Sequence, residues 1–396
     1  MYNFNEIIDR NGSGCVKYDA LEDFFGRGGL TPLWVADMDW ETPDFIRKAL
    51  LERLSHPIYG YGTIPAEYFS TISGWIRSLH GWEVDPAHIR YIPGIVKGIA
   101  FAERCFLNPG DKVIIQTPVY HPFRLVTEGC GFEPVFNPLL PVYDSDGFVC
   151  GYEMDFDGLG KLIDDRCRML VLSNPQNPSG VCWSRETLAR LASICHARGI
   201  MVVSDEIHCE MAFDGHVPYA SASPEAAGNS ITFMAPSKTF NIAGIVSSYC
   251  IVPDSKVREK FFSWLESAEL DSPSIFSVVA TMAAYTKGDA WRREMLAYLK
   301  ENIDFVDAFL RARIPQIRAM RPQASFLIWL DCRKLALPQE KLVSLFTDGA
   351  GLALNDGSMF GAEGTGFMRL NAGCPRQVLS ESLESLEKAV KNQNIL

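Results

Sequence analysis

Polar side chains with distinct chemistry follow four short apolar runs of the sequence. A lysine can form an imine with an aldehyde, a buried carboxylate can hold a cation, and an asparagine amide can donate to an anionic oxygen. In α/β proteins, ligands bind beyond the carboxyl ends of the strands, so polar residues just after apolar runs are the first candidates for a site. Four segments have this position: Thr117 to Tyr120, Asn174 to Gly180, Asp205 to His208 and Ser237 to Phe240.

The apolar runs themselves predict strands buried on both faces, because they are short, rich in β-branched residues and bounded by turn residues. Between two of them, Ser184 to Arg198 predicts a helix with Ser184 as N-cap and Gly199 as its end. Strands that alternate with helices indicate an α/β fold with a mostly parallel sheet and helices on both faces. The predicted strands are Lys112 to Gln116, Met169 to Ser173, Ile200 to Ser204 and Ile231 to Met234.

The last third of the chain has a different pattern, after a break near Ser272-Pro273. A helical pattern with dispersed charge runs from about Asp289 to Arg313, and strands are predicted over Ala324 to Asp331 and Gly364 to Leu370. This indicates a smaller α+β domain. We expect an N-terminal arm that contributes to the small domain (1–45), a large domain (46–275) and a C-terminal small domain (276–396).

Composition narrows the class of protein. The chain has 396 residues, of which 47% are hydrophobic and 21% charged, and its formal net charge is -11. A negative charge of this size repels nucleic acid and anionic membranes at long range. No apolar run is long enough to span a bilayer, and the first residues lack the pattern of a secretion signal. We therefore expect a cytoplasmic protein without a nucleic-acid or membrane partner.

The eleven cysteines are odd in number, scattered, and include no Cys-x-x-Cys pair. Free thiols are the expected state in a chain without an export signal. A zinc site made of Cys195, His196, His208 and Cys209 is the alternative, but structural zinc sites have tighter paired spacing. No metal is expected.

Together and in this order, the four polar segments resemble the fold-type-I enzymes that depend on pyridoxal 5'-phosphate (PLP), the class I/II or aspartate aminotransferase superfamily. The resemblance extends from Pro32 to Arg376. It implies an aspartate-aminotransferase-like fold, PLP as cofactor and an amino acid as substrate. It also implies that Lys238, in its Ser-Lys context, holds PLP as a Schiff base.

The resemblance gives roles to three further residues. Asp205 would keep the pyridine nitrogen protonated, Asn177 would donate to the phenolate oxygen, and Tyr120 would stack on the cofactor ring. Lys238, Asp205 and Tyr120 are thus the expected catalytic residues. Asp205, Asn177 and Tyr120 also have plain structural explanations, as a helix N-cap, a turn residue and a half-buried core tyrosine respectively.

The cofactor phosphate is expected at a helix start, where backbone N–H groups converge. The segment from Pro93 to Gly98 precedes an apparent helix through Ala100 to Arg104. By family position, the N–H groups of Ile95 and Val96 and the hydroxyl of Ser237 would bind the phosphate.

The substrate contacts are implied in the same way. Arg369 occupies the family position for the arginine that binds the substrate α-carboxylate, and Asn177 is expected beside it. Tyr61 matches a tyrosine that reaches the phosphate and substrate from the partner subunit. The resemblance therefore implies a homodimer with the active site at the subunit interface.

Three positions depart from the family pattern. His208 stands where a tyrosine is frequent, and its role as a cofactor contact is open. Val246 replaces an arginine that is frequent eight residues after the lysine, and Ala235 replaces a common serine. The phosphate is therefore expected to be held by fewer charged groups than in aspartate aminotransferase.

Four blocks resemble the MalY/PatB branch of cystathionine or cysteine-S-conjugate β-lyases: Trp34 to Asp39, Asp205 to His208, Ser237 to Asn241 and Arg369 to Arg376. The branch implies that the freed Lys238 removes the α-proton and that a thiolate leaves, which gives pyruvate and ammonia. An aminotransferase would use the same residues and is the alternative. A protein-binding regulatory role in addition to catalysis is a second alternative. A dehydrogenase is not expected, because no Gly-x-Gly-x-x-Gly follows an early strand.

Overall fold

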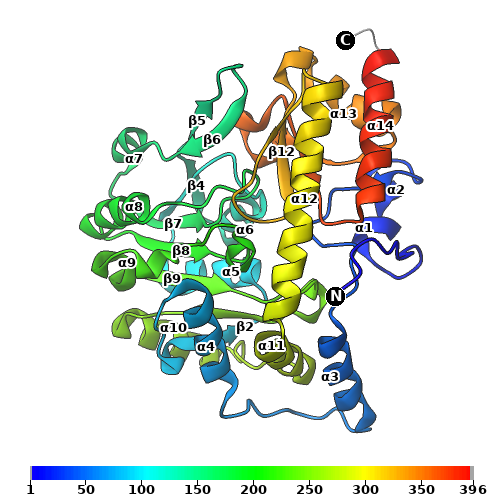
Figure 1. Ribbon diagram of the computed structural model, residues 1–396. Helices are drawn as coiled ribbons and strands as arrows, with labels where there is room; N and C mark the ends of the chain where they lie inside the picture. Colours follow the sequence, from blue (N-terminus) through cyan, green and yellow to red (C-terminus); the bar gives the residue numbers. More distant parts are fainter. Residues whose placement is uncertain (1, 393–396) are drawn as a thin grey trace.

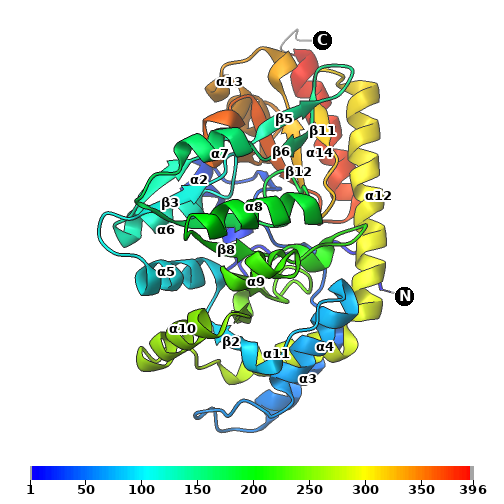
Figure 2. The same ribbon diagram turned by 90° about the vertical axis from the view of Figure 1, so that its left-hand side faces the viewer.

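A large, mostly parallel sheet is the centre of the structure, a computed structural model that describes residues 2–392 (Figures 1 and 2). Residue 1 and residues 393–396, at the ends of the first and last predicted segments, lie outside the described range. In the sheet, β9, β8, β7, β3 and β4 run parallel, and β10 is antiparallel to both of its neighbours. The strand order is β2 (Ile89–Ile92), β10 (Ser248–Ile251), β9 (Ser230–Met234), β8 (Met201–Asp205), β7 (Cys167–Ser173), β3 (Lys112–Ile115) and β4 (Glu133–Phe136).

Helices cover both faces of this sheet, as predicted. Alternate residues of β7 explain why, since Met169 and Val171 pack into one apolar cluster while Leu170 and Leu172 pack into another. The first cluster is closed by α5 (Ile95–Phe106), α6 (Pro122–Cys130) and α10 (Ser255–Ser267). The second is closed by α7 (Phe156–Leu162), α8 (Arg185–Ala197) and α9 (Pro224–Gly228). The sequence prediction of an α/β fold is confirmed.

A second, antiparallel sheet lies in the C-terminal part and packs against long helices. Its strand order is β11 (Arg318–Met320), β12 (Leu327–Asp331), β15 (Phe367–Asn371) and β14 (Asn355–Asp356). The helices of this part are α12 (Asp289–Arg313), α13 (Gln339–Ser344) and α14 (Arg376–Asn392), and Figure 1 shows α12 and α14 running side by side. A hairpin of β5 (Leu140–Tyr143) and β6 (Val149–Glu153) forms a separate two-stranded sheet.

The N-terminal segment joins the C-terminal part through backbone pairing. After α1 (Val16–Asp19) and α2 (Leu21–Phe25), β1 (Thr31–Pro32) pairs in parallel with β13 (Leu352–Ala353). This pairing supports the proposal that residues 1–45 contribute to the small domain, and the three-part division itself stays a prediction. The next helices, α3 (Asp44–Ser55) and α4 (Tyr68–His80), pack against α11 (Ile275–Lys287).

Several predicted boundaries can be compared with the structure. The predicted helix over 289–313 is confirmed as α12, and the Ser184 hydroxyl caps α8 by accepting the N–H of Thr187 at 3.2 Å. The predicted start of the strand at Ala324 is wrong, since Ser325 has a left-handed backbone (φ +77°) that ends an extended run. The strand predicted from Gly364 begins later for the same reason, because Gly366 has φ +85°.

No helix within residues 2–392 combines the length and apolar character needed to cross a bilayer. All eleven cysteines are free thiols.

Candidate active site

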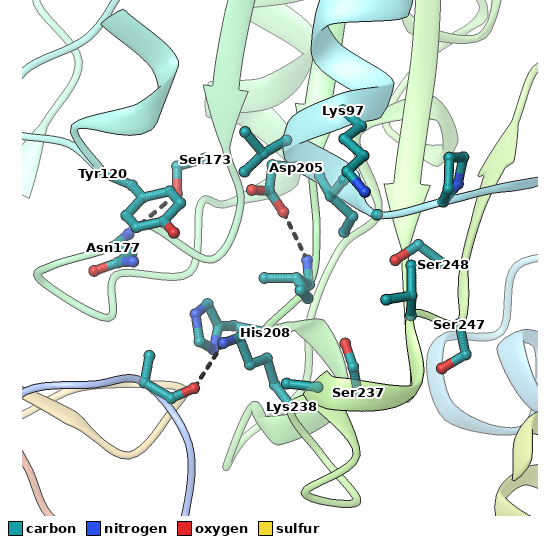
Figure 3. A pocket seen from close by; sticks show the side chains of 18 of the residues that line it. Lys97, Tyr120, Ser173, Asn177, Asp205, His208, Ser237, Lys238, Ser247 and Ser248 are labelled. Carbon is teal, nitrogen blue, oxygen red and sulfur yellow. Dashed lines mark hydrogen bonds between the residues drawn. The ribbon is translucent and has the colours of Figure 1, made fainter. Parts of the chain in front are cut away.

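A cavity of about 300 Å³ lies at the carboxyl edge of the large sheet (Figure 3). Strands β3, β7, β8 and β9 end at this edge because they are parallel, so the segments that follow them meet there. The structure brings eight of the ten predicted site residues to the cavity wall: Ile95, Val96, Tyr120, Asn177, Asp205, His208, Ser237 and Lys238. Arg369 and Tyr61 do not line it.

Lys238 lies at the bottom of the cavity in the view of Figure 3. Its Nζ donates a hydrogen bond of 2.6 Å to the carbonyl oxygen of Ala36, in the loop that follows β1. Burial lowers the pKa of Lys238 to about 8, although the carboxylates of Asp37 and Asp205 act in the opposite direction. A substantial part of this amine is therefore uncharged near neutral pH, which a nucleophile or a base requires.

Asp205 is the last residue of β8 and faces the middle of the cavity. Its Oδ1 accepts the N–H of Ile207 at 3.0 Å, and no side chain of residues 2–392 forms an ion pair with it. Burial raises the pKa of Asp205 to about 7, against the lowering effect of this backbone hydrogen bond. A buried carboxylate without a cation favours a ligand that brings a protonated nitrogen.

Asn177 and Tyr120 lie together at one end of the cavity. The backbone N–H of Tyr120 donates to the carbonyl oxygen of Asn177 at 3.0 Å, which fixes the two residues relative to each other. The side-chain oxygen of Asn177 accepts a 3.1 Å hydrogen bond from Arg369. The amide –NH₂ of Asn177 is consequently left to donate to a ligand oxygen.

Arg369 is buried directly behind Asn177, with its guanidinium 5.0 Å from the centre of the Phe360 ring. It donates to the carbonyl oxygen of Trp34 at 2.9 Å and to Oδ1 of Asn355 at 2.5 Å, while its Nε has no partner. Burial lowers the pKa of Arg369 to about 10, so the side chain remains charged at neutral pH. It contacts the cavity wall through Asn177, and its buried Nε–H has no hydrogen-bond partner within residues 2–392.

His208 is buried in the cavity wall, whereas Tyr61 is exposed to solvent. Burial lowers the pKa of His208 to about 3, and the charges of Lys238 and Arg369 act in the same direction, so this imidazole is neutral. Tyr61 lies in the extended segment between α3 and α4, with its side chain fully exposed. The structure therefore does not bring Tyr61 to the cavity of its own chain.

The opposite end of the cavity contains the start of α5 and several serine hydroxyls. Helix α5 begins there after Gly94, whose φ of +110° is unfavourable for any residue with a side chain. The N–H groups of Ile95 and Val96 belong to the first turn and have no acceptor within the described chain. The hydroxyls of Ser237 and Ser248 line the same end.

Three polar lining residues at this end were missed by the sequence reasoning: Lys97, Ser247 and Ser248. Lys97 is the third residue of α5, and its position beside the predicted phosphate loop was a signal that could have identified it. Ser248 is the first residue of β10, an antiparallel strand that the apolar pattern did not reveal. Lys97 places a cationic side chain at this end of the cavity.

These features together fit PLP. The donor-rich start of α5 suits a phosphate, Asp205 suits a protonated pyridine nitrogen, the Asn177 amide suits a phenolate oxygen, and the Lys238 amine suits an aldehyde. The zinc alternative has no support, since no group of three or more His, Cys, Asp or Glu side chains in residues 2–392 is arranged to hold a metal ion.

Comparison with known proteins agrees with this assignment. Residues 30–386 match the aminotransferase class I and II family. The chain is 41% identical over 391 residues to cystathionine beta-lyase PatB of Bacillus subtilis, covering 98% of this chain and 100% of PatB. It is 32% identical to the MalY protein of Escherichia coli over 99% of both chains. The crystal structure of a PLP-bound C-S lyase from Staphylococcus hominis superposes with a TM-score of 0.90 at 31% identity, over 98% of each chain. The chain belongs to the aminotransferase class I and II family.

Proposed function

We propose that the protein is a PLP-dependent C–S β-lyase that cleaves cystathionine or a related cysteine S-conjugate to a thiol, pyruvate and ammonia. The observation that carries the proposal is the full-length similarity to cystathionine beta-lyase PatB, since it selects one reaction among those that the site residues can support. The similarity to the C-S lyase of Staphylococcus hominis supports the same choice.

The proposed reaction gives each side chain of the site a task. Bound PLP supplies an electron sink for the negative charge that develops when the α-proton leaves. Lys238 would hold the cofactor through its amine, and the same Nζ would take the α-proton of the substrate. The Ala36 carbonyl, which accepts a hydrogen bond from this amine, holds it at the cavity wall. Asp205 keeps a proton on the ring nitrogen, and Arg369 binds the substrate carboxylate from behind Asn177.

An aminotransferase is the alternative, because the same side chains would serve proton removal in both reactions. The two differ in the need for a keto acid. We expect purified enzyme to release pyruvate and a thiol from cystathionine without any added keto acid, as followed with lactate dehydrogenase and a thiol reagent. Product that forms only when a keto acid is supplied would replace the lyase by an aminotransferase.

The pKa of Lys238 gives the proposed function a pH dependence. Only the uncharged amine attacks an aldehyde, so covalent capture of PLP by the cofactor-free protein should accelerate with rising pH and level off above about 8. At pH 7.5 roughly a quarter of such an amine is uncharged, against on the order of one in a thousand for an ordinary lysine. Stopped-flow absorbance between pH 6 and 10 measures this rate. A rate that still rises steeply between pH 9 and 10 contradicts the lowered pKa.

The proposal includes a homodimeric assembly and a cytoplasmic location. We infer a homodimer in which Tyr61 reaches the partner's cavity, and the exposed apolar side chains of Leu51, Leu54, Ile58 and Tyr59 support it. Sedimentation equilibrium checks this, and a fully active monomer at micromolar concentration would rule it out. A cytoplasmic location is supported by the eleven free thiols, which suit a reducing compartment.

A further inference from the structure

Lys97 is a cation at the donor-rich end of the cavity and has no ion-pair partner among residues 2–392. Its side chain lines the cavity together with Ser237 and Ser248, and Figure 3 shows all three on the side away from Tyr120 and Asn177. No hydrogen bond or ion pair joins the Lys97 ammonium to another residue of the described chain. An exposed lysine without a partner is ordinary on a protein surface, but this one borders a cavity at a helix start.

Position 246 is where the family frequently places an arginine for the same end of the site, and this chain has valine there. Val246 lines the cavity, and its backbone adopts a left-handed conformation with φ +37° and ψ +74°. That conformation is strained for a β-branched residue. Its carbonyl oxygen accepts a hydrogen bond of 3.1 Å from the Tyr91 hydroxyl, which helps to hold the turn.

The charge balance of the cavity shows what a phosphate would need. A phosphate monoester carries a charge of about -1.5 to -2 at neutral pH. The first turn of α5 offers N–H groups and the partial positive charge of the helix dipole, and the two serines offer hydroxyls. Lys238 is committed to the cofactor aldehyde and His208 is neutral. Among the described lining residues, Lys97 is therefore the cation that remains for the phosphate.

We propose that Lys97 binds the phosphate of PLP and supplies, from the first turn of α5, the positive charge that position 246 lacks. The proposal rests on the proposed function, because it requires that the cavity holds PLP. It adds that this chain delivers the phosphate cation from α5 instead of from position 246. A lysine acts at this place as a point charge, in contrast to the two-pronged contact of an arginine.

The test is the affinity of the full-length, cofactor-free protein for two ligands that differ only in the phosphate, PLP and pyridoxal. We expect Lys97→Ala to raise the Kd for PLP by about tenfold to a hundredfold, the range for a lost hydrogen bond to a charged group. The Kd for pyridoxal should not change, since pyridoxal has no phosphate. Absorbance titration gives both constants without relying on turnover.

A second substitution tests whether the phosphate needs a positive charge at this end of the cavity, whichever residue supplies it. Adding Val246→Arg to Lys97→Ala should restore most of the PLP affinity, because it returns a cation from the family position and removes a β-branched residue from a left-handed turn. Lys256→Ala is the matched control, since it removes an exposed lysine from the first turn of α10, outside the cavity, and should leave both constants unchanged.

The outcomes distinguish this proposal from the proposed function. A wild-type protein that fails to bind PLP overturns the proposed function and Lys97 with it. A wild type that binds PLP, together with a Lys97→Ala variant that binds it equally tightly, overturns only the role of Lys97. An equal loss of PLP and pyridoxal affinity in Lys97→Ala also overturns it, because the effect would then not involve the phosphate.

Discussion

Lys238→Ala is expected to abolish pyruvate release from cystathionine and to remove the visible absorbance of the lysine–cofactor imine. The amine combines a lowered pKa with a place in the wall of the cavity that also holds Asp205. Loss of a positioned general base alone costs about 10²- to 10⁴-fold in rate, and the covalent link to the cofactor is lost as well. We therefore expect kcat to fall by at least about 10³-fold.

Two measurements on the same samples make this result specific. The absorbance spectrum reports the imine, and a coupled assay with lactate dehydrogenase reports pyruvate. Lys161→Ala, which removes an exposed lysine from the last turn of α7, should match the wild type in both. A Lys238→Ala protein that keeps the visible band, or that works within tenfold of the wild-type rate, would show that another amine holds the cofactor.

The part of this site that the sequence could predict is the part attached to strand ends. Asp205, Asn177 and Lys238 each follow a continuous apolar run, and such runs are strands of a parallel sheet. Parallel strands present their carboxyl ends at one edge, so the order of the runs is enough to bring these side chains together. The prediction was successful because it needed only local pattern and one topological rule.

Other contacts of the site depend on packing between distant segments and have no local signal. The Ala36 carbonyl that holds Lys238 lies 202 residues away in the chain, and Asn355 reaches Arg369 from a short edge strand. Arg369 was predicted at the cavity, yet it lies behind Asn177, because Trp34 and Asn355 bind its guanidinium there. Contacts of this kind form where segments distant in the sequence pack against each other. The apolar pattern of a single strand carries no information about them.

Asp205→Asn should reduce kcat strongly while leaving the cofactor bound. The neutral amide cannot keep a proton on the ring nitrogen, so the charge stabilisation that makes the cofactor an electron sink is lost. A loss of about 10²- to 10³-fold is expected, as for removal of one fixed electrostatic contact to a developing charge. The visible imine absorbance should persist, in contrast to Lys238→Ala. An Asp205→Asn enzyme with wild-type kcat would remove Asp205 from the catalytic residues.

The same substitution should stabilise the cofactor-free protein, because Asp205 is a buried carboxylate without an ion-pair partner among residues 2–392. Its folded-state pKa of about 7 lies above its ordinary value near 3.8, so the unfolded chain releases this proton more readily. The resulting destabilisation is absent below about pH 4, grows as pH rises, and reaches its full size above about pH 7.

Asparagine keeps the oxygen that accepts the Ile207 N–H but carries no charge. Cofactor-free Asp205→Asn should therefore unfold a few degrees above the wild type at pH 8 and at the same temperature as the wild type at pH 4. Calorimetry at the two pH values measures this difference, and an equal or lower Tm for the variant at pH 8 would mean that the carboxylate has a compensating partner. Saturation with PLP should reverse the order at pH 8, since the wild-type carboxylate then gains the ring nitrogen as its cation.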